Sequence, residues 1–341
     1  TFNPAPLHRQ TAMAFVDCLL MTAQIVDIKS LQPSARRVAI LNGFGRTLGD
    51  GIIGLQALHL AIRLGFMPPR PTLFRLAGFG PMAAAIHAAA DFADIRILPE
   101  AHATPKTRFG GADEFDHVID IRDFALTADF QRTSMIDFFL RRLGIEPRFV
   151  PSGLKRNAWL APRVAMQPAS RPWGYVLVCP HASTPLRDMP DEIHDGILRQ
   201  LAGSCAVVTQ GHVPSDLAAE VAHAPECATL AELCTLVRNA RWVISTDTAM
   251  VHLADAFGVP CLAFFPTHRP DWRVRDYPRC VAVALRPALP PGLEFARGID
   301  DHAQARRAWF PDGADLSWLR RVIRNCAAWQ RPRAVPSQTI A

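Results

Sequence analysis

The chain has 341 residues, of which 49% are hydrophobic and 20% are charged, and its formal net charge is +6. This length accommodates two domains, and the composition excludes a globally disordered chain. The basic residues occur singly or in pairs rather than in one block, so the sequence argues against a nucleic-acid partner. It suits a smaller anionic ligand or peripheral contact with an anionic membrane surface.

The first half of the chain is predicted to contain a helical extension and one α/β domain. Within residues 1–35, the apolar stretch 12–28 is interrupted by Asp17, Gln24 and Asp27, so it predicts an amphipathic helix rather than a membrane span. Residues 36–150 alternate between strands and helices, which is typical of a Rossmann-like domain with a parallel sheet. The strands are expected at 37–42, 72–75, 95–98 and 117–121, and the helices at 52–64 and 81–90.

The same alternation returns after a Pro- and Arg-rich stretch, residues 151–172, which is predicted to be a linker. Residues 173–315 then form a second Rossmann-like domain, 316–330 a C-terminal helix, and 331–341 a disordered tail. Strands are expected at 175–180, 206–211, 242–247 and 261–265, and helices at 190–201, 230–240 and 248–257. The fold class is therefore α/β, with two doubly wound domains facing a central cleft, and ligands are expected beyond the carboxyl ends of the strands.

The eight cysteines are expected to be free thiols. No two are spaced as CxxC, no His pair has zinc-ligand spacing, and several cysteines lie in apolar strand-like runs. Unpaired thiols are typical of a reducing compartment, which predicts a cytoplasmic protein. The cysteines are Cys18, Cys179, Cys205, Cys227, Cys234, Cys261, Cys280 and Cys326.

The junction at Asp247 and Thr248 is the most informative segment, because a strand ends there and a helix begins. The unpaired N–H groups of a helix N-terminus, with the helix dipole, form an anion site that suits a diphosphate. A helix N-cap is the alternative role for Asp247.

This segment resembles the heptosyltransferases of glycosyltransferase family 9, whose pattern is Asp-Thr-Gly-x-x-His-Leu-Ala-x-Ala-x-Gly-x-Pro. Here it reads Asp247-Thr248-Ala249-Met250-Val-His252-Leu-Ala-Asp-Ala-Phe-Gly-Val-Pro. The family's N-terminal Leu-Gly-Asp turn is similar to the turn that ends in Gly49 and Asp50, and its Tyr-Asp-x-x-Ile-Asp-Leu-Arg strand is similar to residues 115–122.

The resemblance implies a GT-B fold, with the acceptor on the first domain and the nucleotide-sugar on the second. It implies an inverting glycosyltransferase that takes a sugar from a nucleotide diphosphate-sugar, with an ADP-heptose-like donor favoured. The acceptor would be a hydroxyl of a lipopolysaccharide-type glycan, another glycan or a protein. We expect a cytoplasmic enzyme, either free or peripheral at the inner membrane, that uses neither a cofactor nor a metal.

The same resemblance implies two catalytic residues. Asp50 would be the base that deprotonates the acceptor hydroxyl, with a helix N-cap as its alternative role. Arg187, which occupies the place of a family Lys, would stabilise the leaving diphosphate. The donor-binding set is completed by residues beyond strand ends of the second domain: Ser183, Thr184, Gly211, Asp247, Thr248, Ala249, Met250 and His252. Gly45 and Gly49 are separate site candidates in the turn of the first domain.

Besides Arg187, two features depart from the heptosyltransferase pattern. Ala249 replaces a Gly, so its methyl group crowds the backbone that a phosphate would approach. The loop after strand 261–265 instead resembles that of bacterial glycosyltransferases that carry tetratricopeptide repeats, through its Pro-Asp-Trp-Arg run. Its candidate donor or acceptor contacts are Arg269, Asp271, Trp272 and Arg273, and a basic surface loop is the alternative.

Two other functions stay open from the sequence. Gly43, Gly45 and Gly49 after a strand resemble a dinucleotide turn, and Arg75 would suit a 2′-phosphate, so an NADP-dependent oxidoreductase is one alternative. The spacing is one residue too long for GxGxxG. The substitutions at Ala249 and Arg187 suggest a non-catalytic nucleotide-sugar- or glycan-binding relative as the other alternative.

Overall fold

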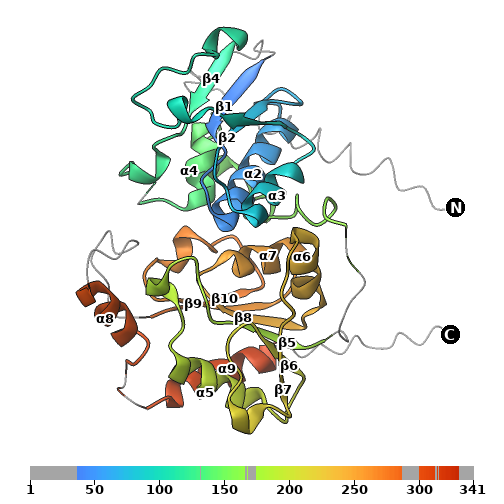
Figure 1. Ribbon diagram of the computed structural model, residues 1–341, viewed down its shortest axis with the longest axis vertical. Coiled ribbons are helices and arrows are strands. Elements are labelled where there is room, and N and C mark those ends of the chain that lie inside the picture. Colours follow the sequence, from blue (N-terminus) through green and yellow to red (C-terminus); the bar gives the residue numbers. More distant parts are fainter. Residues whose placement is uncertain are drawn as a thin grey trace, which may run out of the picture.

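The computed structural model describes residues 37–130, 132–165, 167, 174–285, 299–311, 313 and 315–329. They form two α/β domains, one above the other in Figure 1. The predicted helical extension 1–35 and the tail 331–341 lie outside the described residues, as does part of the predicted linker 151–172. Among the described residues no helix is both long and apolar enough to cross a membrane.

The first domain contains a parallel four-stranded sheet in the order β3-β2-β1-β4. All five residues of the central strand β1 are buried, as expected for a parallel strand covered on both faces. The strands are β1 (Val38–Asn42), β2 (Thr72–Leu76), β3 (Asp94–Leu98) and β4 (His117–Asp120), and the helices are α2 (Leu48–Arg63), α3 (Pro81–Ala88) and α4 (Met135–Arg142).

The second domain contains a parallel six-stranded sheet in the order β10-β9-β8-β5-β6-β7. The strands are β5 (Val176–Cys179), β6 (Val207–Thr209), β7 (Val221–His223), β8 (Trp242–Thr246), β9 (Cys261–Phe265) and β10 (Cys280–Ala284). The helices are α5 (Asp191–Leu201), α6 (Leu230–Asn239), α7 (Ala249–Phe257), α8 (Ile299–Arg307) and α9 (Ser317–Trp329). The predicted fold class is confirmed, whereas the sequence analysis missed α4, α8, β7 and β10.

Helix ends in the second domain follow local capping chemistry. Thr229 and Glu232 form a capping box at the start of α6. Thr248 caps α7, and Gly258 ends it in the left-handed conformation at φ 66°, where a glycine avoids the Cβ penalty. These caps set where α6 and α7 begin and where α7 ends, and therefore hold the β8–α7 junction at the carboxyl edge of the sheet.

The two faces of the second sheet have different partners. Figure 1 shows α6 and α7 on the face turned toward the first domain, and α5 and α9 on the opposite face. Residues of α6 and α7 share one buried apolar cluster with residues of the first domain, whereas α5 and α9 belong to a separate cluster. The surface between the domains is therefore built around α7.

Residues 152–160, at the start of the predicted linker, pack against the first domain. Trp159 is 1% exposed, and its Nε1 donates a hydrogen bond to the carbonyl of Ile52 at 3.0 Å. Gln56 donates to the carbonyl of Leu154 at 2.6 Å. Residues 152–160 are thus anchored on α2, and the domain boundaries proposed from the sequence stay a prediction.

The seven cysteines in the described part of the chain are all unpaired. Four of them are buried, and burial raises the pKa of the Cys234 thiol to about 12, so this thiol stays protonated at neutral pH.

Candidate active site

The turn after β1 has an unusual backbone. Asn42, Gly43, Phe44 and Gly45 are consecutive residues with positive φ, which for a non-glycine residue costs free energy and occurs preferentially at functional sites. The Phe44 side chain is fully buried over Gly54 of α2, where an added Cβ would lie 2.2 Å from it. This packing holds the turn against α2.

Asp50 lies in the first turn of α2, which begins at Leu48, four residues earlier than predicted. The helix N-cap is Thr47, whose hydroxyl accepts the N–H of Asp50 at 3.2 Å, so the alternative role of Asp50 as N-cap is wrong. Gly45 leaves room for the carboxylate, because a Cβ at residue 45 would lie 2.9 Å from Asp50 Oδ2. The Asp50 carboxylate is therefore not used to cap the helix.

Asp50 faces the second domain in a poorly solvated environment. Burial among protein atoms raises the pKa of its carboxyl group, and the charges of Arg273, Arg187 and His268 partly offset that effect. These three residues belong to the second domain. The structure therefore brings a carboxylate with a raised pKa opposite positively charged groups, which is the arrangement expected of a general base near an anionic leaving group.

Asp247 is the centre of a buried charge network at the end of β8. It is 2% exposed and accepts hydrogen bonds from Arg187 Nη1 at 3.1 Å and from His268 Nδ1 at 2.8 Å. Burial acts to raise the pKa of Asp247. The hydrogen bond and charge of His268, together with the charges of Arg187 and Arg273, lower it far below its usual range. Asp247 is therefore ionised at neutral pH.

Arg187 has donors left for a ligand. Its Nη2 donates to Ser183 Oγ at 2.8 Å, whereas its Nε is buried without a hydrogen-bond partner among the described residues. The Arg187 carbonyl accepts from Thr246 Oγ1, which ties the β5–α5 loop to β8. An unsatisfied charged donor beside a helix N-terminus suits a phosphate oxygen.

The N-terminus of α7 differs from one expectation. Its N-cap is Thr248, whose hydroxyl accepts the N–H of Met250 at 3.1 Å. The alternative that Asp247 is only the helix cap is therefore wrong, because the Asp247 carboxylate is engaged by Arg187 and His268 instead. This separates the charged network from the helix cap, although the two residues are adjacent in the chain.

Gly49 of the first domain lies directly against α7. A Cβ at Gly49 would lie 3.0 Å from His252 Cδ2 and 3.7 Å from Ala249 Cα. His252 is buried, its Nδ1 lies 2.9 Å from the Tyr277 hydroxyl, and burial lowers its pKa to about 4, so it is neutral at pH 7. His252 is thus placed to support this contact rather than to carry charge.

The remaining predicted residues occupy nearby or peripheral positions. The Thr184 hydroxyl caps the short helix η7 (Pro185–Arg187), and Met250 is buried in α7. Gly211 follows β6 and packs on Pro180 and His194. The structure therefore brings Ser183, Arg187, Asp247 and the α7 N-terminus together, with Gly211 to one side.

The loop after β9 divides into two parts. Arg269 pairs with Asp271 at 2.7 Å on the surface, and its guanidinium lies 5.7 Å from the ring centroid of Trp272. Arg273 instead lies over the ring of Phe130 in the first domain, at 5.9 Å, and its charge acts on both Asp50 and Asp247. Arg273 therefore belongs to the charged site around Asp50 and Asp247, whereas Arg269 and Asp271 form an ion pair with each other on the surface.

His268 is the site residue that the sequence analysis did not select. Its Nδ1 lies 2.8 Å from Asp247 Oδ2, and it is 8% exposed. The signal was its position: it lies three residues beyond β9, while Asp247 follows β8, and β8 and β9 are neighbours in the sheet. Residues just beyond adjacent parallel strands meet at the same edge.

The two parallel doubly wound sheets form a GT-B-like fold, with the Asp50 carboxylate of one domain facing Arg187 and Arg273 of the other. Residues 157–275 match the family model described as glycosyltransferase family 9 (heptosyltransferase). The match favours this class over the NADP-dependent oxidoreductase that the glycine turn left open. No curated protein matches the chain significantly in sequence.

Solved heptosyltransferase structures share the fold at low sequence identity. The E. coli heptosyltransferase WaaC with ADP is 15% identical over 86% of this chain and 100% of its own, with a TM-score of 0.53. TibC of enterotoxigenic E. coli H10407, described as an iron-containing dodecameric glycosyltransferase, is 17% identical over 89% of this chain and 78% of its own, with a TM-score of 0.57. A complex of TibC with ADP-D-β-D-heptose gives a TM-score of 0.59 at 15% identity, over 89% of this chain and 78% of its own.

Proposed function

We propose that this chain is an inverting glycosyltransferase that moves a sugar from a nucleotide diphosphate-sugar to an acceptor hydroxyl. The observation that carries the proposal is the position of Asp50, whose carboxylate faces Arg187, Arg273 and His268 across the domain interface. A base on one domain and a cationic site on the other are what a direct displacement between an acceptor and a diphosphate-linked sugar requires.

Asp50 would act on the acceptor. Its carboxylate takes the proton of the acceptor hydroxyl as that oxygen attacks the anomeric carbon of the donor sugar. The new bond forms on the face opposite the bond to the phosphate, so the anomeric configuration inverts. A raised pKa makes the Asp50 carboxylate a better proton acceptor than an ordinary aspartate carboxylate.

Arg187 and the start of α7 would receive the leaving group. The electron pair of the broken C–O bond goes to the nucleotide diphosphate, whose charge Arg187 and the N–H groups at Thr248 and Ala249 would stabilise. The unpaired Arg187 Nε supports this role, because an additional acceptor would satisfy it. No residue in this scheme needs a metal ion or another cofactor.

Asp247 would hold the donor sugar rather than the phosphate. Its ionised carboxylate repels a phosphate, but its remaining acceptor capacity suits sugar hydroxyls. Arg187 and His268 fix its orientation, so a hydroxyl bound by Asp247 would lie beside the cationic site.

We favour an ADP-heptose-like donor and a hydroxyl on a lipopolysaccharide-type glycan, another glycan or a protein as the acceptor. The support for the donor is the match of residues 157–275 to the family and the ADP and ADP-heptose ligands named for WaaC and TibC. The unpaired cysteines of the described residues support a cytoplasmic enzyme, and the net charge of +6 would suit peripheral contact with an anionic inner-membrane surface.

A donor comparison tests the proposal. ADP-, UDP-, GDP- and CMP-linked sugars are each mixed with the protein, and both the melting temperature and the release of nucleotide are measured. We expect ADP-heptose to raise the melting temperature most, because a ligand that binds only the folded state stabilises it. We also expect slow ADP release that an acceptor glycan accelerates, with inversion visible by NMR. Absence of both stabilisation and release with every donor would overturn the proposal.

A further inference from the structure

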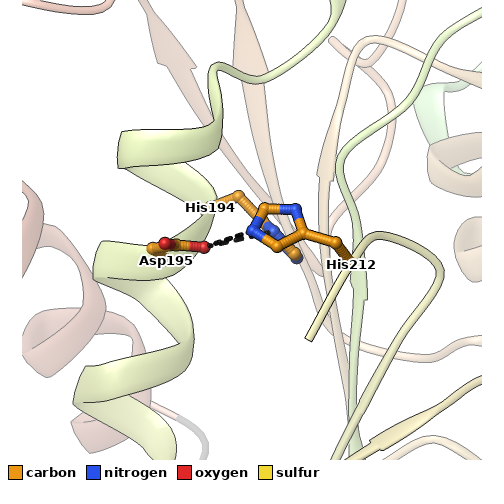
Figure 2. Close-up of side chains that lie close together, drawn as sticks. All are labelled: His194, Asp195 and His212. Atoms are coloured by element: carbon orange, nitrogen blue, oxygen red, sulfur yellow. Dashed lines mark ion pairs between the residues drawn. The ribbon is translucent and has the colours of Figure 1, made fainter. Parts of the chain in front are cut away.

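Three potential metal ligands meet beside α5, and none of them has a role in the transfer scheme. His194 and Asp195 are consecutive residues of α5, and His212 lies three residues beyond the end of β6. Figure 2 shows the three side chains converging between the helix and the adjacent loop. Asp195 Oδ1 lies 2.8 Å from His212 Nε2 and 3.9 Å from His194 Nδ1. All three candidate ligand atoms lie within 4.8 Å of one another.

The hydrogen bonds of His194 determine which ring nitrogen is available. Thr209 Oγ1 accepts the N–H of Gly211 at 3.0 Å and has one proton, which it donates to the carbonyl of Val178 at 3.3 Å. His194 Nε2 lies 2.8 Å from the same hydroxyl oxygen, and we assign its proton to this contact. This tautomer leaves the lone pair of Nδ1 directed toward Asp195.

That lone pair has no partner in the described part of the chain. His194 is 1% exposed, and its Nδ1 is buried without a hydrogen bond. In the opposite tautomer Nδ1 would carry a proton, but it would still lack a hydrogen-bond acceptor, because Asp195 Oδ1 is 3.9 Å from Nδ1. A buried, unsatisfied imidazole nitrogen is uncommon unless a ligand completes it.

His212 has the complementary arrangement. Its Nε2 faces Asp195, while its Nδ1 lies 3.7 Å from Asp191 Oδ1. A carboxylate behind the second ring nitrogen is the usual support of a metal-bound histidine. His212 is half-exposed, so its ring can move toward a shared ion, to which the bonds would be about 2.0–2.2 Å long.

We propose that His194, Asp195 and His212 bind a divalent transition-metal ion, with His194 Nδ1, an Asp195 carboxylate oxygen and His212 Nε2 as ligands. Two imidazoles and one carboxylate suit Zn²⁺, Co²⁺, Ni²⁺ or Fe²⁺ and disfavour Mg²⁺ and Ca²⁺. Three protein ligands leave the ion at least one open position. The bound ion would join α5 to the loop after β6, at the carboxyl edge of the second sheet. This site is independent of the proposed transfer reaction.

The test uses the full chain, stripped of metal with a chelator and then dialysed. Zn²⁺ alone is titrated by calorimetry, and Co²⁺ alone is titrated while its visible absorption is recorded. We expect one ion per chain, a higher melting temperature with Zn²⁺, and a Co²⁺ spectrum without the thiolate charge-transfer band that cysteine ligands produce. Loss of a ligand in Asp195→Asn or His212→Ala should weaken binding by about 100-fold or more, and Asp191→Asn by about 10–100-fold.

Two controls separate this site from other metal binding. His302→Ala removes an exposed histidine of α8 and should leave the affinity unchanged. Because His194 is buried and its variants can fail to fold, the decisive variants are Asp195→Asn and His212→Ala, whose melting temperatures without metal should match that of the unmodified chain. Equal Zn²⁺ affinity in all variants, a thiolate band with Co²⁺, or no binding would each overturn the proposal.

Discussion

Replacing Asp50 by Asn tests the general base and gives opposite expectations for activity and stability. Loss of a general base lowers turnover by about 10²–10⁴-fold, which corresponds to about 3–5 kcal/mol of transition-state stabilisation. Burial raises the pKa of Asp50, so its ionised form is disfavoured in the folded protein. Removing that charge should therefore leave the free energy of unfolding at pH 7 unchanged or higher, whereas most substitutions lower it by about 1 kcal/mol.

The pH dependence follows with a definite sign. An acid whose folded pKa is raised is protonated at a higher pH than usual, so kcat/KM should fall on acidification through a pKa above the ordinary 3.8. Asp50→Asn should abolish this acidic limb. In the same domain, Asp94→Asn breaks an exposed ion pair with Arg96, and this variant should keep both turnover and the acidic limb.

The assay follows release of nucleotide diphosphate in the presence of acceptor between pH 4 and 8, with melting temperatures of both variants measured alongside. Near-normal turnover in Asp50→Asn would refute the assignment of the base. A fall in melting temperature of more than about 5 °C, equivalent to more than about 1 kcal/mol in a protein of this size, would show that the carboxylate stabilises the fold instead. A reduced turnover with an unchanged acidic limb would assign that limb to another group.

Further predictions concern the second domain and the interface. Arg187→Ala should lower both turnover and nucleotide affinity, and it should lower stability by about 3–5 kcal/mol because buried Asp247 loses a partner; calorimetry and thermal melts measure both. Asp247→Asn should weaken binding of the nucleotide-sugar more than of the free nucleotide diphosphate, and equal weakening would contradict its sugar-binding role. Because the folded pKa of Asp247 is depressed, its carboxylate contributes stability above pH about 4 that is lost on acidification, so Asp247→Asn should lose less stability than the unmodified chain between pH 6 and 3. Gly49→Ala should lower turnover with little change in secondary structure, since its Cβ would meet His252; unchanged kinetics would show that the α2–α7 contact can relax. Transfer should persist in EDTA, and abolition that Mg²⁺ reverses would refute a metal-free mechanism.

Local sequence patterns predicted most of the elements because their causes are local. A buried apolar run such as Val38–Asn42 can hardly be anything but a central parallel strand, and Thr248 followed by a helical pattern predicts where α7 begins. The missed elements lack such signals. The strands Val221–His223 and Cys280–Ala284 lie at the two edges of the second sheet, where they are short or only partly buried and depend on a neighbour for their hydrogen bonds.

The order of the motifs along the chain predicted the family resemblance and the candidate residues Asp50, Arg187 and Asp247. Tertiary structure alone decided what these residues contact. The pairing of Asp247 with Arg187 and His268, the position of Asp50 opposite their charges, and the contact of Gly49 with His252 all join residues from separate elements. Such contacts depend on how sheets and helices pack across the domain interface, and a backbone propensity read along one stretch of chain carries no information about that packing.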